Sequence, residues 1–493
     1  MKSERSPLWV IVVIMYVLAL VTCKSMGINY SQADITQAIT TVYPTKDYVI
    51  SDFIVTGFGA KAEPGFDNRA AFQSAIDAAY KDGGGVVFIP AGTYEFRSTS
   101  TGIKAADHSG IGTTVTEDHS YEYVLRLLQG VQLRGDWISP ELNDGKVEGT
   151  VLAVYAGRNS PNYDTMTAAK YWTGDTEMSV ADRFIDMLPS TGVTNLSIWY
   201  PEQDVNNIVP YPWTIMQSPV SFMQDLCATV ENVTLVNSYN GIFACSGNLH
   251  YLFNSYITAL NSGIKITRCA DIGRIENIKI KPKYWAESGL PNSPSLDAVT
   301  AITRENGIGI HLHFSEWEYV TNVHITGYDI GMMLDKQPVN GIPMNGQLYG
   351  LVIDNCKTGI YALDILIYGL IVSNSTFISS EEDRNVYISP LFNTSIQFNG
   401  VQFTGPIVSE ATGGVISFEN CTFDGYRDYA LDFTGGNMLL TQCEFKKPDG
   451  HVKLGPDFSL FKAMNSGYGA VIHQRNLVYT NEGNASVEFN NGE

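Results

Sequence analysis

Five carboxyl side chains have the residue type and the setting needed to cleave a glycosidic bond. They are Glu202, Asp204, Glu316, Glu318 and Asp335. Glycoside hydrolysis uses a proton donor and a second carboxylate, which stand about 6.5–9.5 Å apart in inverting enzymes. Aromatic residues next to such acids desolvate them and raise their pKa, as a general acid requires. We predict Glu318 or Glu316 as the acid and Asp335 or Asp204 as the base, with Glu202 as a further candidate. The alternative is that these are solubilising surface acids.

Large aromatic residues lie in or beside the segments that hold these acids, and their flat faces could stack on sugar rings. The predicted substrate-binding residues of this kind are Trp199, Tyr200, Trp213, Trp285 and Trp317, and Trp172 lies in a similar segment. The alternative is that each ring fills a gap where a loop packs on the scaffold.

A basic stretch favours a different chemistry. Its members are Lys265, Arg268, Arg274, Lys279, Lys281 and Lys283. Three of them alternate with apolar residues and so share one face of a strand, where Lys281 is our candidate for binding a uronate. A Lys or Arg there could also abstract the proton in β-elimination. The alternative is a solvated face balanced by nearby acids. His311 and His313 also alternate along one strand, but two imidazoles alone are a weak metal signal. We therefore predict no metal and no cofactor.

The elements that position these residues repeat along the chain. Short blocks that begin with Asn or a related residue recur, among them Asn232-Val-Thr-Leu, Asn254-Ser-Tyr-Ile, Asn277-Ile-Lys-Ile and Asn322-Val-His-Ile. Spacings of about 21–25 residues with alternating apolar positions predict coils that bury their apolar faces by stacking on one another. The two 45-residue gaps, from Asn232 to Asn277 and on to Asn322, are interpreted as two coils each. The Asn-x-Ser/Thr sites, such as Asn195 and Asn374, are interpreted mainly as turn and ladder positions.

The chain opens this repeat with a helix and a short strand. Phe72, Ala75, Ile76, Ala79 and Tyr80 form one apolar helical stripe, which predicts a helix over 67–81 that begins at an Asp67 cap and ends at a glycine run. A buried strand follows at 86–89. Four polar segments are too long for a coil wall and are predicted insertions that build a groove: 99–122, 158–182, 201–217 and 282–306.

The stretch from Gly57 to Tyr94 resembles the opening of the pectate-lyase superfamily domain. It holds Phe58-Gly59-Ala60, an AAFQSAIDAA helix and GGGVVFIPAGTY, and it departs from the pattern only at Glu63–Phe66. The resemblance implies a single-stranded right-handed parallel β-helix, all-β, with an N-terminal helix covering one end. The superfamily includes enzymes related to glycoside hydrolase family 28, but this chain lacks the catalytic blocks of the polygalacturonase and calcium-dependent lyase branches. The resemblance therefore implies no catalytic residue.

Composition and the ends of the chain set the class of protein. Residues 1–27 hold a basic start and an apolar run too short to span a membrane, which predicts a secretory signal, with an N-terminal anchor as the alternative. The other predicted parts are an N-terminal segment at 28–50, the β-helix at 51–475 and a tail at 476–493. Loss of the signal removes three basic residues and one acidic one, so the net charge goes from −20 to −22. Such a chain is not expected to bind nucleic acid or anionic lipid.

Six cysteines remain after the signal, with no paired spacing typical of zinc sites. Cys421 and Cys443 occupy the same repeat position, and we predict a stacked pair of thiols there on neighbouring coils. The leading hypothesis is a secreted inverting glycoside hydrolase that acts on a polysaccharide. The alternatives are a uronate polysaccharide lyase and a non-catalytic β-helical protein that binds or adheres to glycans. The polysaccharide and the oligomeric state stay open.

Overall fold

The computed structural model of the chain describes residues 53–103, 120–160, 166–171, 174–179, 181–217, 228–245, 248–269, 271–336, 341–380, 382–468 and 477–490. All of them belong to the compact unit Ser51–Glu493. The predicted signal and N-terminal segment, together with Trp172 and Cys227, lie outside the described residues. Within those residues, no helix has the length and apolar character needed to cross a membrane.

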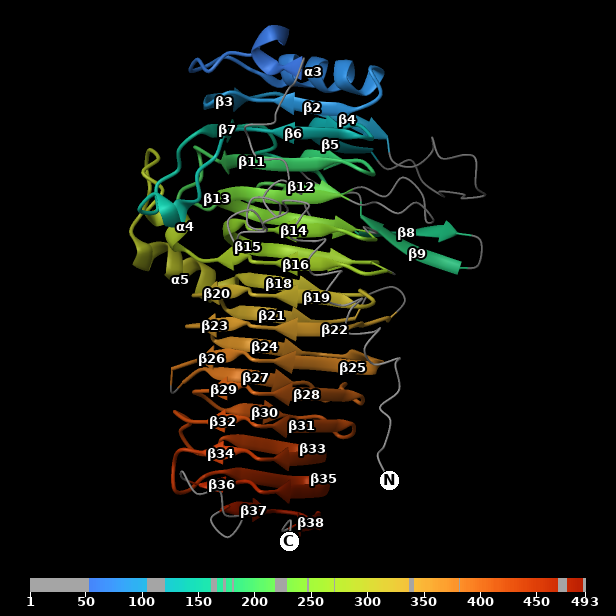
Figure 1. The fold of residues 1–493 in the computed structure, drawn as a ribbon, viewed down its shortest axis with the longest axis vertical. Helices are drawn as coiled ribbons and strands as arrows, with labels where there is room; N and C mark the ends of the chain where they lie inside the picture. The colour runs from blue at the N-terminus through green and yellow to red at the C-terminus, as the bar shows by residue number, and fades with distance from the viewer. Residues whose placement is uncertain are drawn as a thin grey trace, which may run out of the picture. The chain divides into compact units, whose positions relative to one another are not determined.

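The chain winds through three parallel ladders of strands, each strand pairing with the equivalent strand of the next coil (Figure 1). One coil consists of β18 (Ile308–Leu312), β19 (Glu318–Thr321) and β20 (His324–Thr326). The next consists of β21 (Ile330–Leu334), β22 (Met344–Tyr349) and β23 (Val352–Asp354), and the three pairs are all parallel. The predicted parallel β-helix is therefore confirmed.

Ladder A contains β1 (Phe53–Ile54), β2 (Gly85–Phe88), β6 (Val131–Arg134), β11 (Gly192–Trp199), β13 (Thr229–Cys245), β14 (Tyr251–Phe253), β16 (Arg274–Glu276), β19, β22, β25 (Ile365–Ser373), β28 (Ser395–Asn399), β31 (Val415–Glu419), β33 (Leu431–Thr441), β35 (Val452–Met464) and β38 (Ser486–Asn490). Ladder B contains β3 (Gly92–Phe96), β7 (Thr150–Val154), parts of β11 and β13, β15 (Tyr256–Thr267), β17 (Lys279–Ile280), β20, β23, β26 (Thr376–Ile378), β29 (Gln402–Phe403), β32 (Thr422–Phe423), β34 (Glu444–Phe445) and β36 (Gly467–Tyr468). Ladder C contains β5 (Ser120–Leu127), β10 (Arg183–Met187), β12 (Trp213–Gln217), parts of β13 and β15, β18, β21, β24 (Thr358–Ala362), β27 (Arg384–Ile388), β30 (Ile407–Ser409), parts of β33 and β35, and β37 (Tyr479–Asn481).

Asparagines form the corner between ladders A and B. Asn232, Asn254, Asn277 and Asn322 all have φ between 44° and 57°, a left-handed conformation that Asn tolerates better than most residues. Their side chains bond from coil to coil, with Nδ2–Oδ1 distances of 2.6 Å from Asn254 to Asn232, 2.9 Å from Asn277 to Asn254 and 3.2 Å from Asn322 to Asn277. The predicted turn and ladder role of these asparagines is confirmed.

The spacing from Asn277 to Asn322 was misread as two coils. The bond between the two side chains and the direct pairing of β17 with β20 make them neighbours. The extra length lies in α4 (Lys283–Ala286) and α5 (Leu296–Asn306), which leave the coil after β17 and return at β18. The predicted insertion at 282–306 is therefore present, but it adds helices to one coil instead of forming a second.

The predicted helix is α3 (Arg69–Lys81), and it lies at the N-terminal end of the coils (Figure 1). Its buried face includes Phe72 and Ile76, as predicted, but Tyr80 is 49% exposed and does not belong to the stripe. The N-cap position is occupied by Asn68 and not by Asp67. Asp67 Oδ1 instead accepts the backbone N–H groups of Arg69 and Arg97, which joins the start of the helix to β3.

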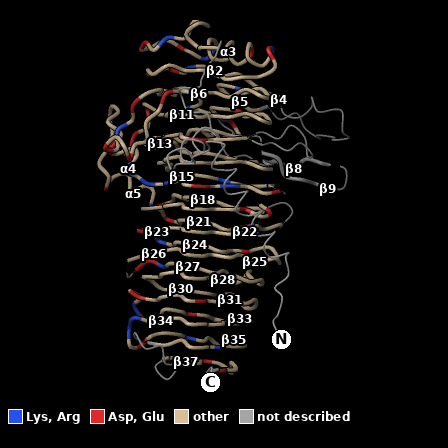
Figure 2. The backbone as a smooth tube through the Cα atoms, viewed as in Figure 1, with Lys and Arg blue, Asp and Glu red and all other residues tan. Residues whose placement is uncertain are grey.

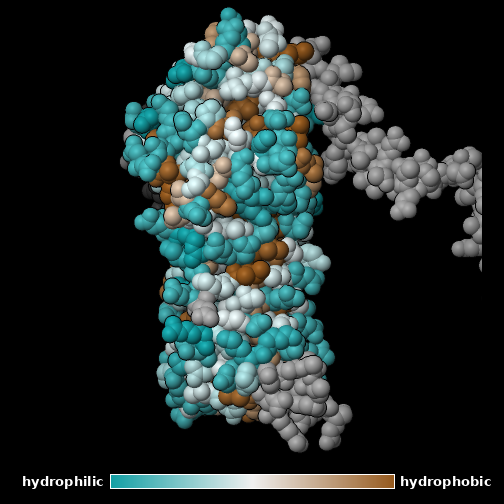
Figure 3. All heavy atoms as spheres, turned by 90° about the vertical axis from the view of Figure 1, so that its left-hand side faces the viewer, coloured by the Kyte–Doolittle hydropathy of each residue, from teal (hydrophilic) through white to brown (hydrophobic). Residues whose placement is uncertain are grey.

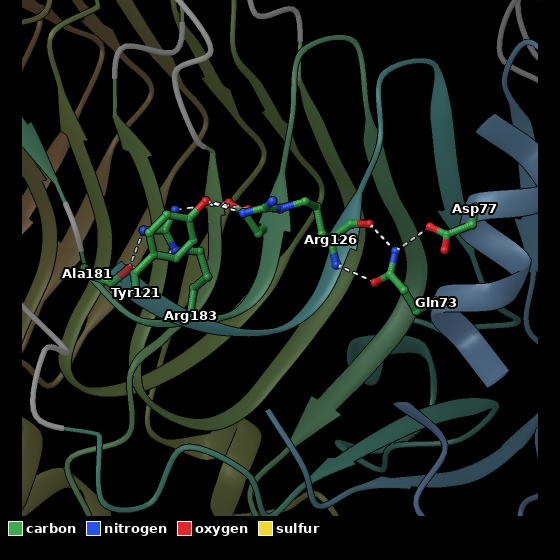
Figure 4. A network of polar contacts seen from close by, with 7 residues as sticks. Gln73, Asp77, Tyr121, Arg126, Ala181 and Arg183 are labelled. Atoms are coloured by element: carbon green, nitrogen blue, oxygen red, sulfur yellow. Dashed lines mark hydrogen bonds and ion pairs between the residues drawn. The ribbon is translucent and has the colours of Figure 1, made fainter. Parts of the chain in front are cut away.

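Gln73 bonds α3 to the first coil, as Figure 4 shows. Its Oε1 accepts the Arg126 N–H at 3.0 Å, and its Nε2 donates to the Arg126 carbonyl at 3.1 Å. These are backbone groups of β5, the first strand of ladder C. The Arg126 guanidinium then donates to the buried carboxylate of Asp186 at 2.8 Å, and the Asp186 carboxylate also accepts from Arg183 at 3.0 Å. Helix α3 is thus bonded to β5, and an ion pair joins β5 to β10 of the next coil.

The interior of the coils is apolar and continuous. Phenylalanines stack along ladder B, with ring centroids 5.4 Å apart for Phe377–Phe403, 5.4 Å for Phe403–Phe423 and 4.7 Å for Phe423–Phe445. Cys421 and Cys443 are buried, unbonded thiols that follow the same corner on neighbouring coils, since β32 pairs with β34. The predicted thiol stack is confirmed.

Two boundaries differ from the sequence prediction. The segment 201–217 is not wholly an insertion, because its end is β12, which pairs with β10 and β13 in ladder C. The ladders also continue to β38, so the predicted end of the β-helix at residue 475 is too early. The segment 158–182 is an insertion and contains the antiparallel hairpin of β8 (Met166–Tyr171) and β9 (Gly174–Ser179). In the segment 99–122, β4 (Ser100–Ile103) pairs antiparallel with β5.

Candidate functional site

Four ionisable side chains lie on the outer face of ladder C. Lys265 on β15 pairs in register with His311 on β18, and Asp335 directly follows β21. His311 and His313 alternate with the core residues of β18 and therefore point away from the coil interior. We name Lys265, His311, His313 and Asp335 the imidazole cluster.

The two imidazoles and the carboxylate are in close contact. The ring centroids of His311 and His313 are 4.1 Å apart, and His311 Nε2 lies 3.7 Å from Asp335 Oδ2. Neither ring nitrogen of His313 has a hydrogen-bond partner, although the residue is only 5% exposed. His311 and Asp335 are more accessible, with 14% and 22% of their side chains exposed. Of the two imidazoles, His311 is the one that a bound ligand would meet first.

The charges in the imidazole cluster are set by its partners. Burial, the largest cause, acts together with the neighbouring His311 and Lys265 to lower the pKa of His313 to about 2, against the opposing effect of Asp335. His313 is therefore neutral at pH 7. Burial would raise the pKa of Asp335, but the neighbouring His311 and a 2.7 Å hydrogen bond from the Lys336 N–H outweigh it and hold that pKa below its usual value. The cluster thus offers a neutral imidazole, a carboxylate and a lysine cation.

An exposed aromatic pair joins the turn between β18 and β19 to strand β25. Trp317 and Tyr368 stack with ring centroids 5.7 Å apart, and they are 45% and 65% exposed. Trp317 has φ of 57°, and its backbone N–H donates to Asn345 Oδ1 at 3.2 Å, which holds the turn in place. This pair has the open ring faces that sugar stacking needs. Sugar binding by Trp317 therefore stays a prediction.

The other predicted aromatic residues have no open face. Tyr200, Trp213 and Trp285 are at most 1% exposed, and Trp199 is 8% exposed. Trp199 packs in one apolar cluster with Trp285 of α4 and Val299 of α5, and the Trp213 ring contacts Phe243 in a tilted arrangement with centroids 4.9 Å apart. Their burial argues against the predicted sugar contact, because Tyr200 lies in the coil core, Trp213 lies on β12, and Trp199 and Trp285 pack against each other.

Glu318 cannot serve as the predicted acid. Its carboxyl is fully buried on the core side of ladder A, 3.0 Å from His250 Nε2, and it also accepts the Ser315 hydroxyl. Burial lowers the pKa of His250, but the Glu318 carboxylate outweighs this and holds it well above the usual value. The result is an internal ion pair that a sugar cannot reach. Glu316 is half-buried, and its N–H donates to the Cys269 carbonyl at 2.8 Å. A catalytic role for Glu316 stays a prediction.

The two acids of the earlier loop are engaged locally. Glu202 forms an ion pair with Arg158 at 3.0 Å and accepts the Tyr211 hydroxyl at 3.2 Å. Asp204 accepts the N–H of Asn206 at 2.9 Å within its own turn. Both side chains are exposed, and a catalytic role for either stays a prediction.

The predicted basic ladder is divided between two sets of partners. Lys279 and Lys283 both pair with Glu141, and blue and red segments accordingly lie together around α4 in Figure 2. Lys281 Nζ donates to His324 Nδ1 at 2.8 Å, and burial together with Lys283 lowers the pKa of Lys281. The face of the molecule that carries α4 and α5 is mainly hydrophilic (Figure 3). Lys279 and Lys283 are therefore neutralised by a nearby acid, whereas uronate binding by Lys281 stays a prediction.

The sequence singled out Asp335 together with Glu316 and Glu318, whereas the structure places it next to His311. The alternation of His311 and His313 was the available signal, and it became specific only when Lys265 and Asp335 joined them from neighbouring coils. Because a coil brings together residues more than twenty positions apart, sequence spacing alone did not associate them.

Comparison with known proteins supports the fold. A mutant tailspike protein of E. coli bacteriophage HK620, solved in complex with a pentasaccharide, superposes with a TM-score of 0.51 at 12% identity, covering 88% of this chain and 80% of that one. The fold is that of the parallel β-helix proteins. The chain matches no family model, so the resemblance to the pectate-lyase superfamily stays a prediction.

Two curated relatives of this β-helix protein come from Azotobacter vinelandii. Mannuronan C5-epimerase AlgE4 is 34% identical over 119 residues, which are 23% of this chain and 18% of the relative. Alginate lyase 7 is 29% identical over 137 residues, or 23% of this chain and 16% of the relative. The match therefore spans less than a fifth of each relative's own length.

Proposed function

We propose that this protein modifies an acidic polysaccharide by removing the C5 proton of a uronate residue at the imidazole cluster. The observation that carries this proposal is the meeting of a lysine cation, two imidazoles and a carboxylate on one outer face of ladder C. The local similarity to an epimerase and a lyase of uronate polymers supports it, because both kinds of enzyme act on such chains.

The chemistry suits these residues. The C5 proton of a uronate lies next to a carboxylate, and it becomes more acidic when a cation neutralises that carboxylate. Lys265 supplies the cation, and His311 is the accessible base that takes the proton, leaving an enolate-like intermediate. Asp335 orients His311 and stabilises the imidazolium that forms. If a proton returns to the opposite face of C5, the product is the epimer. If the oxygen at C4 leaves and takes a proton, the chain is cut and a C4–C5 double bond remains.

The predicted inverting hydrolase has less support. It needs two accessible carboxyls across a bond, and Glu318 is held inside the coil by His250. The uronate lyase, which the sequence left as an alternative, uses residues that the fold brings together. The exposed pair of Trp317 and Tyr368 is the proposed sugar platform beside the cluster.

The test is turnover of mannuronan, polyguluronate, polygalacturonate and a neutral β-1,3-glucan in D₂O. Ultraviolet absorbance reports an unsaturated uronate, and NMR reports deuterium at C5 of an intact chain. We expect one of these two signals on a uronate polymer, and a loss of about 10²–10⁴ in kcat for His311→Gln. Lys265→Met should raise KM.

The matched control is His324→Gln, which alters a histidine of ladder B and should keep the wild-type rate. Full activity of His311→Gln would show that the reaction occurs elsewhere. Reducing ends released from the neutral glucan would favour the hydrolase, and binding without turnover on all four polymers would favour the non-catalytic alternative.

A further inference from the structure

A second group of side chains that could bind a metal ion lies inside the coils, on the face of the strands that points to the core. His250, Cys269 and Glu318 each offer one nitrogen, sulfur or oxygen atom, and these atoms all lie within 4.8 Å of one another. All three residues are at most 1% exposed. The proposed uronate chemistry uses none of them.

The register of ladder A explains how they meet. Tyr251 pairs with Arg274 and Arg274 with Tyr319, so His250, Gly273 and Glu318 occupy one row across three coils. Gly273 lies between the other two and has no side chain. A Cβ there would come within 2.2 Å of His250 Cε1 and 2.5 Å of Glu318 Oε2. The absent side chain is what lets the imidazole and the carboxylate meet across two coil spacings.

This row faces the core. Its members are two positions from Leu252, Ile275 and Val320, which are fully buried in the apolar interior. A carboxylate in such surroundings is costly unless it is fully partnered. Glu318 has His250 Nε2 at 3.0 Å from one oxygen and the Ser315 hydroxyl on the other. Cys269 completes the group from the end of β15, with Sγ 2.7 Å from the Asp271 carbonyl.

We infer that His250, Cys269 and Glu318 form a Zn²⁺ site in the interior of the β-helix. Thiolate, imidazole and carboxylate are the ligands that Zn²⁺ takes, at about 2.0–2.3 Å, and this places ligand atoms about 3–4 Å from one another. Calcium and magnesium prefer oxygen ligands alone. Zn²⁺ carries two positive charges, which the thiolate of Cys269 and the carboxylate of Glu318 balance. Ser315 holds the second carboxylate oxygen and so fixes the orientation of Glu318.

The ligands come from three successive coils, so the ion would join those coils where ladder C turns into ladder A. Because the site is closed, Zn²⁺ would enter as the coils form and not afterwards. The expected role is structural, independent of the reaction at the imidazole cluster.

The test uses the full chain expressed in medium supplemented with Zn²⁺ or with Co²⁺. Elemental analysis should find about one Zn²⁺ per chain after dialysis against a weak chelator. The cobalt form should show the near-ultraviolet band of a Co–thiolate bond. Cys269→Ser and His250→Gln should lose the band and weaken Zn²⁺ binding by more than about 100-fold, which exceeds the loss typical of changing a residue that only holds a ligand in place.

Two variants serve as controls. Cys356→Ser alters another buried thiol and should keep the band. His313→Gln alters the imidazole cluster and should also keep it, which separates this site from the proposed catalytic one. A wild-type chain that retains no zinc and shows no Co–thiolate band would overturn the inference, and this measurement decides the matter even if the ligand variants fail to fold.

Discussion

His250 and His313 show how burial acts on one residue type with two outcomes. Both are nearly inaccessible, yet the pKa of His250 is held above its usual value and that of His313 falls to about 2. The difference is the neighbour. His250 faces the Glu318 carboxylate at 3.0 Å, whereas His313 lies against His311 and near Lys265. A carboxylate in direct contact favours the imidazolium, whereas burial beside another imidazole and a lysine favours the neutral ring.

The neutral state of His313 predicts a pH dependence of stability. An unfolded histidine takes up a proton below about pH 6.5. The folded chain accepts that proton only near pH 2, so the unfolded state binds more protons between these values. The free energy of unfolding should therefore fall as the pH drops below 6.5, by up to about 1.4 kcal/mol per pH unit from this residue.

Urea unfolding at pH values from 7 to 4.5 measures this effect. The slope should be smaller by that amount in His313→Gln. Equal slopes in wild type and His313→Gln would show that His313 is already protonated in the folded chain. The lowered pKa of Asp335 affects the free energy of unfolding only at pH values near and below the ordinary pKa of an aspartate. Its effect therefore does not overlap with that of His313 between pH 7 and 4.5.

The asparagine corner is the element on which the stacking of coils depends. Each asparagine combines a left-handed backbone with a side-chain amide that bonds the coils on either side. Asn277 donates to Asn254 and accepts from Asn322. One residue type therefore meets a backbone requirement and a hydrogen-bonding requirement at the same position.

Two substitutions separate these requirements. Asn277→Gly keeps access to φ of 56° but loses both amide bonds, whereas Asn277→Ala loses the bonds and also strains the backbone. We expect both to be destabilised, and the Ala variant to be less stable than the Gly variant by about 1–2 kcal/mol. The free energy of unfolding in urea measures the difference. Equal stability of the two variants would mean that the backbone relaxes out of the left-handed region.

These elements also show what sequence reasoning could and could not reach. The coil period, the asparagine corners and the thiol stack follow from local repeats, so they were predicted. The clusters at His311 and at His250 join residues from different coils, and only the register fixes which side chains face each other. The inserted helices α4 and α5 give one coil the sequence length of two. This is why the spacing from Asn277 to Asn322 predicted an extra coil. The buried tryptophans were misassigned because the sequence does not say which surface an insertion will cover.

At the scale of the whole molecule, the net charge of −20 opposes the proposed substrate. A polyuronate chain is repelled over a distance set by the Debye length, about 30 Å at 0.01 M salt and 10 Å at 0.1 M. Contact with Lys265 acts at much shorter range and is screened less. Binding therefore depends on a local cation that works against the field of the protein as a whole.

The KM for a uronate oligomer should consequently fall when salt rises from 10 to 150 mM, by a factor of at least about two. Initial rates at several substrate concentrations measure it, with kcat as the internal control that should change little. A KM that rises with salt would show that local basic residues, and not the net charge, dominate the encounter.

The side insertion that holds α4 and α5 has a practical consequence for engineering. Since Asn277 bonds directly to Asn322, the chain leaves the coil and re-enters it without disturbing the stacking, and loop-closure cost grows only slowly with length. We therefore expect that the segment between β17 and β18 can be replaced by another sequence without loss of the coil stacking. A replacement must still bring its own apolar face, because Trp199, Val236 and Leu260 would otherwise be left open to water.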